Sequence, residues 1–167
     1  MNDHTIALLK ECNSGCKMAV NSMDQIRKYI TDSRLENLID TYRGKFEKTE
    51  DASSQMLEDC GIHEKEPSMM AEAFSWISTE MKMMLDRDNS QVAKIMMDGC
   101  NMGIQSVGKF LNQYDQATKE SRRLGGSRFS YRFIHHIFPL FFTCPYYRPP
   151  DGDFATGEMK GVKKVCD

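Results

Sequence analysis

Apolar side chains in residues 1–120 recur at alternating steps of three and four, which is the spacing of one buried helix face. The first such segment spans about residues 3 to 30, and Asp3 is expected to cap its N-terminus. Its buried face is predicted to be Leu9, Cys12, Cys16, Ala19, Met23, Ile26 and Ile30. The pattern therefore predicts a long amphipathic helix at the start of the chain.

A second helix is predicted to begin at Asp32 or Ser33, either of which can cap it, and to end near Cys60. Gly61 follows, and glycine readily adopts the left-handed conformation that ends a helix. The predicted face of this helix is Leu35, Leu38, Tyr42, Phe46, Thr49, Ser53, Met56 and Cys60.

Two further helices are predicted. A shorter one runs from about Ser68 to Leu85 with Met70, Phe74, Ile77, Met81 and Met84 on its face. The fourth is capped by Asp88 or Asn89 and runs to about residue 117, or as far as Leu124. Its predicted seam is Val92, Ile95, Gly99, Met102, Ser106, Phe110 and Tyr114.

None of these four helices can bury its apolar face alone, and the connections between them are short. Short connections make sequential helices antiparallel neighbours, so residues 1–120 are predicted to form an all-α, up-down-up-down four-helix bundle. The third helix is shorter than the others by several turns. Part of the bundle therefore lacks a fourth wall, which either the C-terminal tail or a second subunit could supply.

Composition changes near residue 120. Residues 1–120 carry a net charge of −6, whereas residues 121–167 carry +4 and hold four of the five prolines. Gly125 and Gly126 mark the change. The chain is thus predicted to have a bundle domain, 1–120, and an irregular aromatic and basic tail, 121–167.

Three explanations of the tail stay open. Its apolar run at 133–142 is an interface for a membrane surface or a partner, or it docks on the open wall of the bundle. The third explanation is a frameshift in the gene near codon 124, because charge, lysine content and periodicity all change there. His135 and His136 point about 100° apart on a helix, which argues against one shared metal ion.

The whole chain has 167 residues and a net charge of −2, which argues against nucleic-acid binding through many phosphate contacts. No long apolar run predicts a transmembrane segment, and no signal segment precedes the first helix. Six cysteines without regular spacing fit a reducing compartment better than a disulfide framework. We therefore expect a cytoplasmic protein.

A carboxylate-bridged di-metal centre is the first chemistry to consider in such a bundle. It requires Glu-x-x-His on two helices, and the chain contains no such motif. A divergent metal oxidase would have to use Glu47, Glu50, Glu80 and Asp98, which lie beside the predicted seams. These carboxylates are more simply interpreted as solvated or edge side chains.

The chain has 13 methionines, and soft sulfur ligands select Cu(I). A copper-binding or storage bundle would use Cys12, Cys16, Cys60 and Cys100 as its thiolate ligands. Core packing explains the same residues, since Cys is a small buried apolar side chain and Met a flexible filler. The leading prediction is therefore that the chain holds no cofactor.

Nucleophilic catalysis has little support, since His63 near Cys60 is the one Cys–His neighbourhood in the bundle. It lies at a helix C-terminus, which does not favour a thiolate. Gly99, Gly103 and Gly108 interrupt the fourth helix, at a cost of about 1 kcal/mol each relative to Ala. We interpret them as packing positions where a neighbouring helix or a second subunit approaches closely.

Three segments carry a resemblance to a known group of proteins. They are Cys12-Asn-Ser-Gly-Cys16-Lys-Met18, Ser75-Trp-Ile-Ser-Thr-Glu80-Met-Lys82 and Met96-Met-Asp-Gly-Cys100-Asn-Met-Gly103, in helices one, three and four. In helix order and length the chain resembles the uncharacterised bacterial four-helix-bundle proteins of the ferritin-like superfamily, over about residues 3–120. The resemblance implies a dimeric bundle with a stress- or spore-associated role. The missing ferritin ligands argue against iron oxidation and storage.

The sequence therefore favours a non-enzymatic interaction or structural module that forms a dimer or binds a protein partner. The copper-binding bundle is the alternative, and the divergent metal oxidase is a second alternative.

Overall fold

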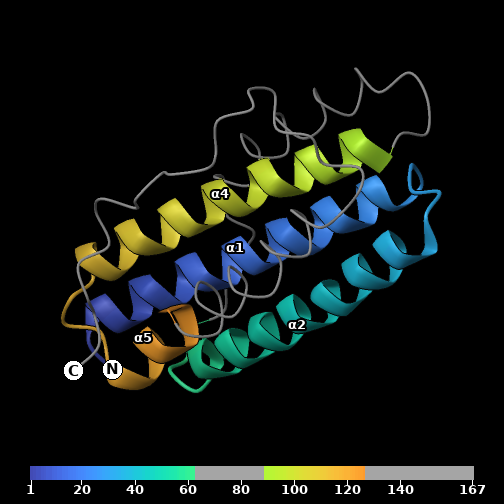
Figure 1. Cartoon of the computed structure of the whole chain (residues 1–167). Coiled ribbons are helices and arrows are strands. Elements are labelled where there is room, and N and C mark those ends of the chain that lie inside the picture. The colour runs from blue at the N-terminus through green and yellow to red at the C-terminus, as the bar shows by residue number, and fades with distance from the viewer. Residues whose placement is uncertain (63–88, 127–167) are drawn as a thin grey trace, which may run out of the picture.

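The computed structural model describes residues 1–62 and 89–126, and every regular element in these ranges is an α-helix (Figure 1). The elements are α1 (Asp3–Arg27), α2 (Ser33–Glu58), α4 (Asn89–Gln113) and α5 (Lys119–Gly126). This confirms the all-α prediction for the described part of the chain. The predicted third helix and residues 127–167 of the tail lie outside it, so the four-helix arrangement stays a prediction.

The ends of α1 and α2 follow from their capping residues. Asn2, rather than the predicted Asp3, caps α1, because its Oδ1 accepts a hydrogen bond of 2.9 Å from the backbone N–H of Thr5. Asp32 caps α2 by accepting from the backbone N–H of Arg34 and Leu35, at 2.8 and 3.1 Å. Gly61 has a φ of 72°, which confirms the predicted left-handed stop.

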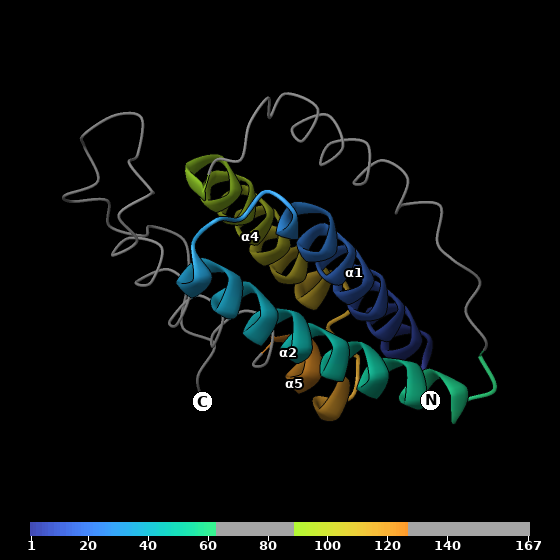
Figure 2. The same cartoon turned by 90° about the vertical axis from the view of Figure 1, so that its right-hand side faces the viewer.

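Helices α1 and α2 lie antiparallel and side by side (Figure 2). Exposed ion pairs connect them along one edge. Arg43 Nε lies 2.6 Å from Asp24 Oδ1, and Arg27 lies 2.9 Å from Asp40. Exposed pairs of this kind contribute about 0.2–1 kcal/mol each, so most of the stability comes from the apolar seam between the helices.

The main core lies where α1, α2 and α4 meet, and both α2 and α4 run antiparallel to α1 (Figure 1). Its buried residues are Cys16, Met23, Ile26, Leu35, Ile39, Tyr42, Phe46, Val92, Ala93, Ile95, Met96 and Met97. Burying a large apolar side chain stabilises the fold by about 1.5–3 kcal/mol. The seam positions predicted at the start of α4 are therefore correct, but Met96 and Met97 join them.

Helix α4 ends at Gln113, earlier than predicted, and a turn separates it from α5. The turn is held against the start of α1. Asn2 Nδ2 donates to the Gln116 carbonyl at 2.7 Å, and the backbone N–H of Thr118 donates to Thr5 Oγ1 at 2.9 Å. The guanidinium of Arg122 then donates to two carbonyls at the end of α4, those of Leu111 and Tyr114. The Leu111 carbonyl lies in the last turn of α4, where a helix leaves carbonyls without an internal partner, so its contact with Arg122 supplies one.

Helix α5 crosses the predicted boundary after residue 120. It lies near the start of α1 and the end of α2 (Figure 2). Leu124 is buried with Leu9 and Leu57 in a second core cluster, so α5 packs on both helices. The described chain therefore stays part of one helical body up to Gly126.

Candidate functional site

The four cysteines proposed as copper ligands lie in different surroundings. Cys12 and Cys16 are buried on α1, Cys100 is half-buried on α4, and Cys60 is exposed at the end of α2. Cys16 and Cys100 contact the main core, whereas Cys12 packs with Leu8 and Ala117 in a separate cluster. Within the ranges 1–62 and 89–126, no group of three or more His, Cys, Asp or Glu side chains could hold a metal ion.

Burial keeps the inner thiols protonated. Burial, together with the charge of Glu11, raises the pKa of Cys12 to about 12. Burial likewise raises the pKa of Cys100 to about 12, and it raises the pKa of Cys16 further. Because the thiolate is both the metal ligand and the nucleophile, these three side chains behave as apolar core residues.

Cys60 differs, since it lies at the surface beside another sulfur. Its Sγ is 3.6 Å from Met1 Sδ, and both side chains are exposed. This contact brings two soft ligand atoms together at one end of the helical body. It is a pair, not the predicted set of four thiols.

The carboxylates proposed for a metal oxidase do not meet in the part of the chain described. Glu47 pairs with Arg43 at 2.6 Å, and Asp98 pairs with Lys94 at 3.4 Å on the surface of α4. Glu50 is half-buried, and burial raises its pKa. Glu80 lies outside the described residues.

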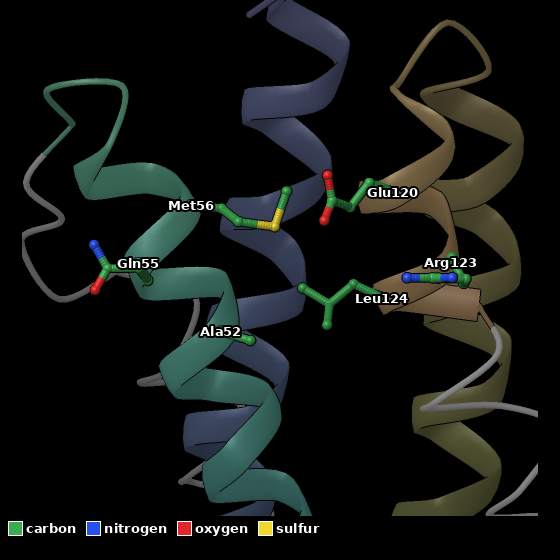
Figure 3. Close-up of a pocket in the computed structure, with 6 residues that line it drawn as sticks. All are labelled: Ala52, Gln55, Met56, Glu120, Arg123 and Leu124. Atoms are coloured by element: carbon green, nitrogen blue, oxygen red, sulfur yellow. The ribbon is translucent and has the colours of Figure 1, made fainter.

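A hollow opens between α2 and α5 (Figure 3). The Glu120 carboxylate and the Met56 sulfur extend toward each other across it, and Ala52 and Leu124 supply apolar walls. Gln55 and Arg123 complete the lining. The hollow has a volume of about 240 Å³, below the ~300–1,000 Å³ that is usual for small-molecule sites. It therefore does not by itself indicate a ligand.

The predicted seam of α4 is interrupted in its middle. Val92 and Ile95 are buried at its start, but Gly99, Met102 and Ser106 are exposed. We call these three residues the open seam. Met102 is 44% exposed, and a Cβ added at Gly99 would meet no atom of residues 1–62 or 89–126 within 4 Å. The prediction of one continuous buried seam along α4 is thus wrong at these positions.

The three glycines of α4 do not form one stripe. At 100° per residue, Gly103 lies about 40° from Gly99 around the helix, whereas Gly108 lies about 180° away. A Cβ at Gly108 would also meet no atom of the described ranges within 4 Å. No helix in the described part of the chain therefore makes the predicted close approach at Gly99 or Gly108, and approach by a second subunit stays a prediction.

Sequence reasoning missed the glycine that does pack closely. A Cβ built at Gly125 would lie 2.9 Å from Cys12 Sγ, closer than real Cβ contacts. In the sequence, Gly125 indicates only a boundary. The signal that could have found it is the helical spacing of the small or apolar residues Ser121, Leu124 and Gly125, which are all buried in α5.

No protein family, curated protein or solved structure matches this chain. Within the described ranges, no helix has an apolar stretch able to cross a bilayer. The described fold is a helical body in which α1, α2 and α4 share the main core and α5 packs on α1 and α2 in a second cluster. Membership of the ferritin-like superfamily stays a prediction.

Proposed function

We propose that this chain is a non-enzymatic interaction module that docks a helix on the open seam of α4. The observation that carries the proposal is the exposure of Gly99, Met102 and Ser106, which continue the line of the buried Val92 and Ile95. Because this helix face is buried at one end and exposed in its middle, its exposed part is available to bind a partner helix.

The free-energy cost of a glycine inside α4 also supports docking on the open seam. A glycine inside a helix costs about 1 kcal/mol relative to alanine, and among the described residues no atom within 4 Å of a Cβ at Gly99 offsets that cost. A partner helix approaching at this point would offset it through close backbone packing. Met102 adds a flexible apolar side chain, of the kind that adapts to a partner surface.

The partner we propose is a second copy of this chain, with the helix of another protein as the alternative outcome. Light scattering combined with size exclusion, at protein concentrations from about 1 to about 100 µM, measures self-association directly, since this range brackets the micromolar dissociation constants of modest interfaces. We expect a dimer whose dissociation constant rises at least about tenfold in Gly99→Gln. A monomer at every concentration would overturn self-association.

Gly108→Gln is the matched control. Both glycines are exposed positions in the same helix with open space, so either substitution should stabilise α4 by about 0.5–1 kcal/mol. Only Gly99 lies on the open seam, so only Gly99→Gln should weaken the dimer. Equal effects of the two substitutions would contradict docking on this face.

Copper binding is the second candidate, favoured by the contact between Cys60 and Met1. Titration of the reduced protein with Cu(I) against a chromophoric chelator would measure it. We expect Cys60→Ser to abolish binding while Cys12→Ser leaves it unchanged. Identical titrations of the two variants would remove the candidate.

A further inference from the structure

The apolar seam between α1 and α2 does not by itself fix how the two helices align. On α1, Leu9, Cys16 and Met23 are buried at seven-residue intervals. On α2, buried positions repeat in the same way, with Leu35, Tyr42 and Thr49 in one series and Ile39, Phe46 and Ser53 in another. Sliding one helix by seven residues would therefore bring similar faces together again.

Asn13 breaks this repetition. It is 1% exposed, and its Nδ2 donates to Ser54 Oγ at 2.6 Å, Ser53 Oγ at 3.2 Å and the Glu50 carbonyl at 3.3 Å. Its Oδ1 is buried and accepts no hydrogen bond from the described part of the chain. The two N–H groups of the amide thus share three acceptors from one turn of α2, whereas its oxygen has no partner there.

The observed alignment is the one that supplies these acceptors. It places Asn13 beside Ser53, and the surface pair of Arg43 with Asp24 lies in the same alignment. A slide of seven residues would place Asn13 opposite the buried aromatic ring of Phe46, or opposite Cys60 at the end of α2. Opposite Phe46 the amide would be buried without its three acceptors, which is strongly unfavourable.

We propose that Asn13, with Ser53 and Ser54, selects the alignment of α1 on α2 and excludes the seven-residue slide that would bury its amide opposite Phe46. Asn13 determines which alignment of the two helices forms, rather than how stable the fold is. Replacing a buried polar group and its orphan atom by an apolar side chain of similar size often stabilises a fold, so stability and specificity should move in opposite directions.

The test compares Asn13→Leu with Ser53→Ala in the full chain. We expect Asn13→Leu to lower the unfolding equilibrium constant about tenfold in urea. Its ¹H–¹⁵N spectrum should show more than one set of amide resonances for α1 and α2, whereas we expect a single set for the wild type. Ser53→Ala removes one of three acceptors, so it should raise the unfolding constant about fivefold and keep a single set.

Asn13→Ala is a second test variant, which covers the case that leucine does not fit the site. It also removes the amide, so it should give multiple resonance sets even though its cavity lowers stability. A single native set in both Asn13 variants would overturn the proposal. A destabilised Asn13→Leu with one native set would show that the amide serves stability alone, which also overturns it.

Discussion

Replacing Gly125 by alanine tests how α5 is seated on α1. The new Cβ would lie 2.9 Å from Cys12 Sγ and 3.9 Å from Leu8 Cδ1. Cys12 is buried, so its sulfur has little room to retreat. We therefore expect Gly125→Ala to be destabilising, although alanine is the better helix former.

The magnitude follows from two opposing terms. Overpacking a filled core costs about 1–3 kcal/mol, whereas the gain in helix propensity is at most about 1 kcal/mol and smaller at the end of a helix. Gly125 is the penultimate residue of α5, so the net loss should be about 1–2 kcal/mol. Gly126→Ala is the control, because its Cβ meets only the flexible end of Leu111, at 3.3 Å.

The assay is urea unfolding of the wild type, Gly125→Ala, Cys12→Ala and the double variant. Cys12→Ala alone should cost about 1 kcal/mol through the lost buried sulfur. In the double variant the methyl group introduced at position 125 occupies the vacated space, so the combined loss should fall short of the sum of the two single losses by about 1–2 kcal/mol. Additivity within about 0.5 kcal/mol would refute the close contact as the cause.

Three further outcomes follow from the structure. Arg122→Met should shorten α4 at its C-terminus, with faster amide exchange near residue 114 and a loss of about 1–3 kcal/mol; unchanged exchange would show that the two carbonyl contacts are unimportant. Burial raises the pKa of Glu50 above its ordinary value of 4.5, so the stability that its protonated form contributes is lost as pH rises above that value. The stability of Glu50→Gln relative to the wild type should therefore increase as pH rises, and a constant difference would contradict this. Iodoacetamide at about pH 8 should modify Cys60 but not Cys12 in peptide mapping of the folded protein, and equal labelling would refute the burial argument.

Local signals predicted the start and end of α2 well. The Asp32 carboxylate caps the N-terminus of α2, and Gly61 adopts the left-handed conformation that ends it. Both effects depend on the residue type and on its near neighbours in the sequence. The end of α4 is not predictable in this way, because residues 114–118 contain neither Gly nor Pro. The break is held by Asn2 and Thr5, more than a hundred residues away in the sequence. A prediction from neighbouring residues alone cannot detect contacts between residues so far apart in the sequence.

The candidate sites were harder to predict for a related reason. The spacing of Gly99 and Met102 identified a helix face, but periodicity does not say whether another helix covers it. The same limit applies to the thiols, since Cys12 and Cys60 look alike in sequence and only packing buries one and exposes the other. Burial then decides the chemistry, because it sets whether the thiol can ionise.

The compositional boundary near residue 120 does not coincide with a structural one, because charge and packing depend on different side chains. The change in charge comes largely from arginines, and Arg122 and Arg123 both lie within α5. Packing depends instead on Leu124 and Gly125, which are buried against α1. Arg123 is exposed and Arg122 binds carbonyls near the end of α4, while Leu124 and Gly125 lie inward, so a shift in net charge need not end a core. The helical body therefore continues to Gly126, past the point where the charge changes.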